Sequence, residues 1–225
     1  GEPHRSFVLR LSQPVLSTNV PGQFELPSEE VRALLTEQTE FLRTALLIID
    51  VQMEFAFRAI AGVPRTTPMA EANIGLLLDA FRTAGGRVVH VHHHSHEAGS
   101  PFTAGQPGAE VQAIARPLAG EATYIKHVNS AFIGTDLEAD LRRHGVQQLV
   151  VCGGTANHCV ETTARMAGNL GFDVFYVADA VWAYGNTGPD GREHSPADVL
   201  SATLSNLHGE FANVVKADDI LQRMA

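Results

Sequence analysis

The sequence predicts an α/β domain that is built on a parallel β-sheet with helices on both faces. Apolar runs alternate with helical segments of about 8 to 15 residues, and this alternation is typical of parallel sheets. Residues 45–50 read Ala-Leu-Leu-Ile-Ile-Asp, a continuous apolar run that ends in an acid. Such a run is typical of a strand that is buried on both faces. Glycines follow several of the helical segments, as they commonly do at helix ends.

The apolar runs and the segments between them give the elements in order. Strands are expected at residues 45–50, 87–92, 122–126, 148–152, 173–177 and 212–216. Helices are expected at residues 70–84, 137–144, 196–207 and from Cys159 to Gly171. Loops rich in Gly, Pro and Ser are expected to shape a pocket at residues 94–108 and 183–196. Before the first strand, residues 1–44 form an N-terminal extension with a helix that begins near Ser28, and residues 45–225 form the main domain.

Composition limits the classes of function. A chain of 225 residues is long enough for one domain with a sizeable core. Its formal net charge of −9 and the lack of a basic stretch argue against a nucleic-acid partner. No apolar run is long enough to span a membrane, so no membrane partner is expected. Two cysteines do not make a disulfide framework, and we therefore expect a reducing, cytoplasmic compartment.

Three residues with reactive side chains lie at the ends of predicted strands. Asp50 ends the first strand, Lys126 ends the third, and Cys159 follows the fourth. Parallel strands present their carboxyl ends at one edge of the sheet, and ligands bind outside that edge. We therefore expect these three side chains to lie close together.

The trio has the residue types that nucleophilic acyl transfer requires. Cys159 follows a Gly-Gly turn at a helix start, where unpaired N–H groups and the helix dipole favour the thiolate. Lys126 would stabilise that thiolate, and Asp50 would take the thiol proton and later pass it to the leaving amine. Backbone N–H groups of the turn would bind the oxyanion, each contributing about 3 kcal/mol. Cys152 lies inside the apolar strand, where cysteine acts as a small hydrophobe.

The sequence around the trio resembles the isochorismatase-like cysteine hydrolases, which include nicotinamidases, N-carbamoylsarcosine amidases and ureide or biuret amidohydrolases. The resemblance covers about residues 44–216 and rests on three motifs, at residues 46–52, at Lys126 with residues 129–132, and at residues 153–160. It implies a three-layer α/β/α sandwich with a six-stranded parallel sheet. It also implies a homo-oligomer, either a dimer or a tetramer.

The resemblance further implies a catalytic triad of Asp50, Lys126 and Cys159. The implied activity is cleavage of a C–N bond in a small amide or ureido compound through a thioester, with release of ammonia or an amine. A cis peptide bond between Thr155 and Ala156 is implied as well. Its role would be to direct the Ala156 N–H, together with that of Cys159, at the oxyanion.

Substrate contacts are expected from residues that follow the strand ends. Aromatic walls with amide and imidazole groups suit a small, flat, uncharged amide or ureide. The candidate contacts are Gln52, Phe55, His92, Phe132, Asn157, His158, Trp182 and Tyr184.

Neither a metal nor another cofactor is expected. Nicotinamidases of this superfamily carry an Asp-x-His motif after the first strand, and residues 50–75 contain none. The alternating histidines of residues 90–96 would share one strand face, but metal sites also need converging carboxylate or carbonyl support. We expect His92 to reach the substrate pocket instead.

Other functions remain open from the sequence. An isochorismatase-type vinyl-ether hydrolase would share the fold, but those relatives often lack the cysteine, so Cys159 favours C–N cleavage. A phosphate-binding turn is disfavoured because Gly153-Gly154 does not continue as G-x-G-x-x-G. A non-catalytic member of the fold that binds a small molecule or acts through subunit contacts is the remaining alternative.

Overall fold

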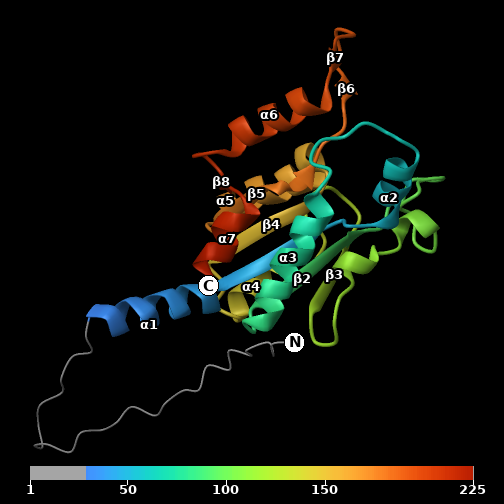
Figure 1. The fold of residues 1–225 in the computed structure, drawn as a ribbon. Coiled ribbons are helices and arrows are strands. Elements are labelled where there is room, and N and C mark those ends of the chain that lie inside the picture. Colours follow the sequence, from blue (N-terminus) through green and yellow to red (C-terminus); the bar gives the residue numbers. More distant parts are fainter. Residues whose placement is uncertain (1–28, 225) are drawn as a thin grey trace, which may run out of the picture.

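The computed structural model describes residues 29–224, and residues 1–28 and 225 lie outside the described part of the chain. Within residues 29–224, six parallel strands form one sheet in the order β3-β2-β1-β4-β5-β8 (Figure 1). The strands are β1 (Thr44–Ile49), β2 (Arg87–His93), β3 (Ala122–Lys126), β4 (Gln148–Gly154), β5 (Asp173–Trp182) and β8 (Asn213–Val215). The predicted six-stranded parallel sheet is confirmed.

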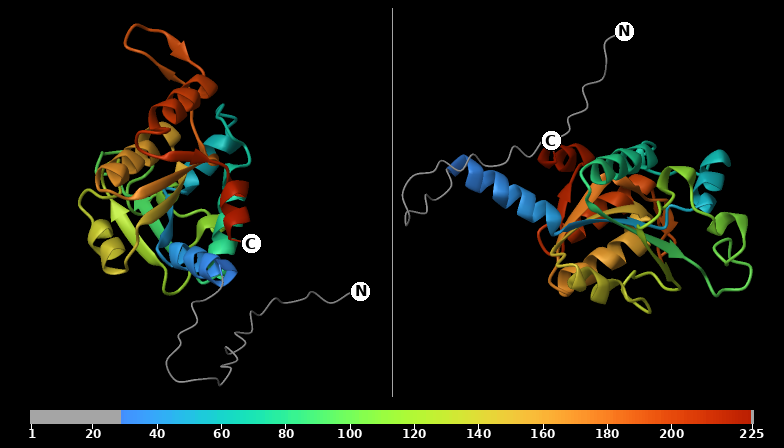
Figure 2. Two further views of the ribbon diagram at one scale, coloured as in Figure 1. Left: turned by 90° about the vertical axis from the view of Figure 1, so that its left-hand side faces the viewer. Right: turned by 90° about the horizontal axis from the view of Figure 1, so that it is seen from below.

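Helices cover both faces of the sheet (Figure 2). The helices are α1 (Glu29–Leu42), α2 (Met53–Ile60), α3 (Ala70–Thr83), α4 (Leu137–Arg143), α5 (Glu161–Asn169), α6 (Pro196–Leu207) and α7 (Ala217–Arg223). One face packs against α4, α5 and α6 through residues such as Leu137, Ala164 and Leu207. The other face packs against α2, α3 and α7, where Leu77 and Ile220 belong to the buried cluster. The three-layer α/β/α sandwich is therefore confirmed.

Burial explains why β1 is the central strand. Every residue of Thr44–Ile49 is buried, because β1 lies between β2 and β4 and has a helical layer on each face. Its apolar side chains alternate between the two cores, with Leu47 in one and Leu46 in the other. A strand that is covered on both faces needs apolar residues at every position, which is the pattern that predicted it.

The strand order creates a switch point between β1 and β4. Connections from β1 run outward to β2 and β3, whereas β4 starts the other half of the sheet with β5 and β8. Ligands of open α/β sheets bind at the carboxyl ends of the strands on either side of such a point. Asp50 follows β1 and Cys159 follows β4, so two of the three predicted catalytic residues flank the switch point.

Some elements were not expected from the sequence. Helix α2 follows β1 directly, and β5 continues to Trp182 past an irregularity in its pairing with β4. A hairpin of β6 (Asn186–Thr187) and β7 (Glu193–His194) projects from the body where a loop was predicted (Figure 1). In the N-terminal extension, α1 leads into the amino end of β1, away from the carboxyl edge of the sheet (Figure 1).

Candidate active site

A cleft of about 710 Å³ opens at the carboxyl edge of the sheet. It receives residues from the ends of β1, β2, β3 and β4 and from the loop that follows β2. The lining residues are Asp50, Phe55, Arg58, His93, Ser95, His96, Glu97, Ser100, Phe102, His127, Val128, Asn129, Thr155, His158 and Cys159. The cleft therefore contains a potential nucleophile, a buried carboxyl group and several imidazoles.

Asp50, Lys126 and Cys159 come together at the base of this cleft. The Lys126 ammonium donates to Asp50 Oδ2 at 2.7 Å, and both side chains are almost completely buried. The Cys159 thiol lies close enough to both groups for their charges to affect its pKa. The second carboxylate oxygen, Asp50 Oδ1, is also buried and does not bond to Lys126. The three residues predicted to act together are thus neighbours in the structure.

Local backbone geometry places the Asp50 carboxyl group. Asp50 has a positive φ of 51°, a conformation that aspartate adopts more readily than most residues. Its N–H donates to Val91 O of β2, and its carbonyl accepts from Gln52 N. The chain therefore bends sharply at the end of β1.

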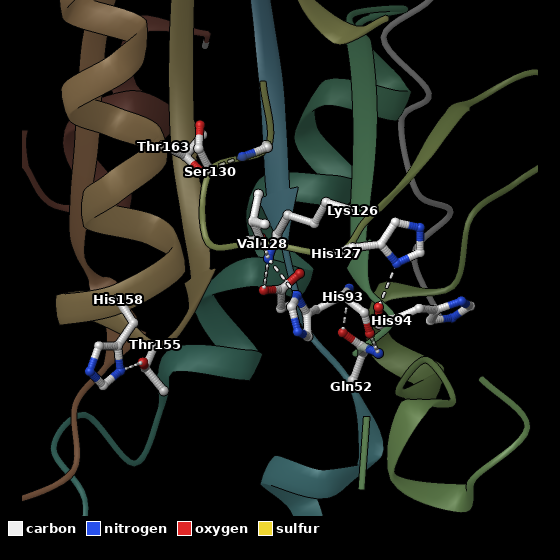
Figure 3. Close-up of polar contacts among 12 residues, drawn as sticks. Gln52, His93, His94, Lys126, His127, Val128, Ser130, Thr155, His158 and Thr163 are labelled. Carbon is white, nitrogen blue, oxygen red and sulfur yellow. Dashed lines mark hydrogen bonds and ion pairs between the residues drawn. The ribbon is translucent and has the colours of Figure 1, made fainter. Parts of the chain in front are cut away.

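The segment after β3 is held against α5, which fixes the position of Lys126. Ala131 N donates to Thr163 Oγ1 at 3.0 Å (Figure 3). Ser130 Oγ contacts Met166 Sδ at 3.2 Å. Val128 O accepts from Lys126 Nζ at 3.2 Å. Contacts of Val128, Ser130 and Ala131 thus hold the segment that follows Lys126.

The turn before Cys159 requires glycine at two positions. Gly153 has a φ of 123°, and a Cβ atom there would overlap the carbonyl oxygen of Ile49 in β1. A Cβ atom on Gly154 would overlap the indole ring of Trp182. The glycines thus let β4 and its turn pass close to β1 and β5.

The cis peptide bond lies one residue earlier than the resemblance implied. It joins Gly154 to Thr155, not Thr155 to Ala156. In a cis bond the two flanking Cα atoms come to about 2.9 Å, and glycine has no Cβ atom to crowd its neighbour. The position with a glycine on one side is therefore the sterically favourable one, and the prediction of Thr155–Ala156 is wrong.

Cys159 does not lie in the first turn of an α-helix. It belongs to a π-helical turn, η3 (Ala156–Val160), that leads into α5. Burial raises the pKa of the Cys159 thiol to about 12, and the negative charge of Asp50 acts in the same direction, whereas Lys126 opposes both. Burial therefore opposes the thiolate that the start of the helix was expected to favour, and Lys126 acts against that effect of burial.

The Asp50 carboxyl group also shows the effect of burial. Burial raises its pKa above the ordinary value, and the Lys126 ammonium opposes that shift. A carboxyl with a raised pKa is a stronger base once ionised, which suits proton exchange with a neutral thiol. Cys152, fully buried in β4, has a thiol whose pKa burial raises further, so it acts as part of the core as predicted.

Of the predicted substrate contacts, Phe55 and His158 line the cleft. Trp182 is fully buried behind Phe55 with an edge contact at 5.3 Å, and Tyr184 stacks on Phe55 at 6.3 Å. These two aromatic residues therefore support the cleft wall and do not form it.

The remaining predicted contacts lie outside the cleft lining. Gln52 is fully buried and bonds the backbone of His93 and Ala109. Phe132 stacks on Phe172 in the core, and Asn157 lies beside His158. The prediction that these three side chains contact a ligand is not supported by their placement.

His92 does not reach the cleft, and His93 takes the predicted place. Side chains alternate along β2, so His90 and His92 share one face while Val91 and His93 share the other. His92 is 8% exposed and lies beside His90 at 6.3 Å between ring centroids. The structure therefore corrects the choice of His92 by one residue. Val89, Val91 and His93 lie on the same face of β2 because side chains alternate along a strand. This alternation is the signal in the sequence that could have identified His93.

The lowered pKa of His92 predicts that the stability of the protein depends on pH. Burial lowers its pKa from 6.5 to about 4. Between these values the unfolded chain takes up a proton and the folded chain does not, so stability is full above pH 6.5 and falls as the pH drops toward 4. The loss attributable to His92 is at most about 3 kcal/mol. We expect His92→Gln to reduce the loss of unfolding free energy between pH 7 and pH 4.5, measured in urea. An equal loss in both proteins would contradict this assignment.

No group of three or more His, Cys, Asp or Glu side chains among residues 29–224 is arranged to hold a metal ion. His90 instead bonds Glu121 Oε2 at 2.8 Å, and Glu121 also pairs with Arg82. Part of the histidine run therefore belongs to a partly buried hydrogen-bond network around the Arg82–Glu121 ion pair. No helix in the described part of the chain is long and apolar enough to cross a membrane.

Known proteins are similar to this chain in both sequence and fold. Residues 44–216 match the sequence profile of the isochorismatase domain. The chain belongs to the isochorismatase family.

An isochorismatase-family protein of Bacillus subtilis, YrdC, is 35% identical over 179 residues, covering 80% of this chain and 95% of YrdC. A crystal structure of an isochorismatase-family protein from Chromobacterium violaceum has a TM-score of 0.77 and 36% identity, covering 91% of this chain and 98% of that one. Nicotinamidase 3 of Arabidopsis thaliana is 30% identical over 190 residues, covering 78% of this chain and 86% of the enzyme. The chain is thus an isochorismatase-family hydrolase.

Proposed function

We propose that this isochorismatase-family hydrolase is a cysteine amidohydrolase that cleaves a C–N bond in a small amide or ureido compound. The observation that carries the proposal is the convergence of Asp50 and Cys159 in one cleft with the buried Lys126, whose ammonium forms a 2.7 Å ion pair with Asp50 beside the thiol. A nucleophile next to a base, with the base held by a third group, is the arrangement that covalent catalysis requires.

In the first half of the reaction, Asp50 takes the thiol proton and Cys159 Sγ attacks the substrate carbonyl carbon. Lys126 stabilises the negative charge that forms on sulfur. The carbonyl oxygen becomes an oxyanion, and the N–H groups of Ala156 and Cys159 bind it. These residues belong to the first helical turn, whose N–H groups have no partners within a helix. Asp50 then gives its proton to the nitrogen, and the C–N bond breaks to leave a thioester.

In the second half, water attacks the thioester carbonyl carbon and Asp50 takes a proton from that water. The C–S bond breaks, Asp50 returns the proton to sulfur, and the carboxylic or carbamic acid leaves. Asp50 and Cys159 are then back in their starting protonation states. The burial of Asp50 supports this role because a carboxyl with a raised pKa exchanges protons near neutral pH more readily.

The cleft lining supports a small polar substrate. Phe55 and Phe102 pack together at 5.3 Å and form an apolar wall, while Arg58 and the imidazoles offer hydrogen-bond donors. His96 and His127 stack at 4.0 Å between ring centroids at the cleft. The similarity to a plant nicotinamidase supports an amide as the substrate class.

The proposal is tested by ammonia release from a panel of small amides and ureides, with the Cys159→Ala variant beside the wild type. We expect at least one compound to give ammonia in the wild type alone. Turnover of a vinyl ether with no ammonia from any amide would show the isochorismatase-type reaction instead. Ammonia release that survives Cys159→Ala would exclude the cysteine mechanism.

A further inference from the structure

Three acceptors surround the Lys126 ammonium, and one of them is a residue to which the proposed mechanism gives no role. Lys126 Nζ lies 2.7 Å from Asp50 Oδ2, 3.2 Å from Val128 O and 3.3 Å from His93 Nδ1 (Figure 3). An ammonium carries three N–H donors. His93 Nδ1 is therefore one of the groups around the ammonium, beside Asp50 and Val128, and the Cys159 thiol also interacts with it.

The sheet order explains why His93 occupies this place. Lys126 ends β3 and Asp50 follows β1, while β2 runs between these two strands. The ion pair must therefore cross the carboxyl end of β2, where His93 is the last residue. Residue 93 is also the register partner of Lys126. Four neighbouring strand ends thus supply Lys126, His93, Asp50 and Cys159 in that order across the sheet.

The backbone of His93 is fixed independently of its ring. His93 N donates to Gln52 Oε1 at 2.9 Å, and Gln52 Nε2 donates to His93 O at 3.0 Å. The ring has an edge contact with Phe102 at 5.9 Å between centroids. The buried Gln52 thus holds His93 in place, and a change of the side chain at position 93 keeps this backbone clamp.

The contact with Lys126 determines the tautomer of His93. An ammonium can only donate, so the contact requires a lone pair on Nδ1, and in the neutral ring the proton is then on Nε2. Burial, followed by the charge of Lys126, lowers the pKa of His93 to about 4, so the ring is neutral at physiological pH. The ring lines the cleft. In this tautomer Nε2 carries a donor hydrogen on a residue of the cleft wall, and the ring also interacts with the Val128 backbone.

We propose that His93 is a positioning residue for Lys126 and that its Nε2–H donates a hydrogen bond to the substrate. This inference rests on the proposed function for its substrate part only. When the thiol proton moves to Asp50, the negative sulfur forms beside Lys126 Nζ. His93 Nδ1 accepts a hydrogen bond from the ammonium and thereby keeps it next to that sulfur. A substrate needs an acceptor for this Nε2–H in addition to the carbonyl that Cys159 attacks. Ureides with a second carbonyl oxygen are the class that provides one.

Two variants separate the two roles of the ring. In His93→Asn the amide oxygen can replace Nδ1 as the acceptor for Lys126, whereas in His93→Gln the longer amide can replace Nε2–H as the donor. On the best amide of the panel, we expect His93→Gln to lower kcat about tenfold with little change in KM, since one bond to a charged group is lost. We expect His93→Asn to keep kcat within about threefold and to raise KM about tenfold. His93→Ala should show both effects.

A readout without substrate distinguishes this inference from the proposed function. The rate of Cys159 alkylation by iodoacetamide at pH 8, followed by peptide mass spectrometry, reports how well Lys126 stabilises the thiolate. We expect His93→Ala and His93→Gln to slow alkylation about tenfold and His93→Asn to restore it. His92→Asn, one residue away on the opposite strand face, should leave alkylation unchanged. Melting curves verify that each variant is folded.

The outcomes separate clearly. Equal alkylation rates in the wild type and a folded His93→Ala overturn the positioning role, even if the protein releases ammonia. Equal KM values in the wild type and His93→Asn overturn the substrate bond. Slow alkylation in His93→Ala with no ammonia from any compound supports the positioning role while the proposed function fails.

Discussion

Replacement of Cys159 by alanine is expected to lower kcat for the amide substrate by about 10⁵-fold or more. The thiol is a cleft-lining nucleophile that interacts with both members of the buried Asp50–Lys126 pair. Without sulfur no thioester forms, and the remaining groups give only oxyanion binding and orientation. Steady-state ammonia release on the purified variant measures the loss. The folded state should persist, because only the sulfur atom of a partly buried residue is removed.

Cys152 provides the matched control. It is the other cysteine of the chain, and it is fully buried in β4 with its thiol near Leu47 O. Cys152→Ala should keep kcat within about threefold and lower stability by about 1 to 2 kcal/mol, the cost of a small cavity. Comparable losses of activity in folded Cys152→Ala and Cys159→Ala would remove the basis for assigning the nucleophile.

Lys126→Ala is expected to reduce both activity and stability. The variant leaves the Asp50 carboxylate buried without its partner, which costs about 3 to 5 kcal/mol of unfolding free energy. It also removes the charge that lowers the pKa of Cys159, so that pKa rises further and alkylation at a given pH slows. We expect kcat to fall by at least about 100-fold. Urea unfolding and the pH profile of alkylation measure the two effects separately.

Two further variants show whether loss of the Asp50–Lys126 ion pair causes the lower activity and stability of Lys126→Ala. Lys216, the second lysine of the chain, is exposed before α7, and Lys216→Ala should change neither readout. The double variant Asp50→Asn with Lys126→Met removes both charges and should regain most of the stability but none of the activity. If the double variant is as unstable as Lys126→Ala, the loss comes from packing and not from an unpaired charge.

The sequence predicts the sheet well because a doubly covered sheet needs continuous apolar strands. The runs at β1 and β4 have almost the same bounds in the structure as in the sequence. The grouping of Asp50, Lys126 and Cys159 follows from the same reasoning, since each residue lies at the carboxyl end of a parallel strand. These features depend on chain direction and periodicity, which a sequence displays directly.

The predictions that were wrong concern side chains whose orientation depends on tertiary packing. His92 and His93 are both histidines at a strand end, and only the position of the two cores determines which one faces the cleft. Trp182 ends β5 and Gln52 follows β1, but contacts with Phe55 and the His93 backbone place them behind the cleft. The burial that raises the pKa of Cys159 comes from the whole surrounding structure, so the local sequence at the helix start does not display it.

The most direct test of the catalytic assignment is to trap the acyl group on the enzyme. The protein is mixed with an amide that it turns over, quenched in acid within milliseconds, and digested for peptide mass spectrometry. The account predicts an added acyl mass on the peptide that contains Cys159, present in Cys152→Ala and absent in Cys159→Ala. An acyl mass on another residue, or full turnover with no adduct on Cys159 at any quench time, would contradict it.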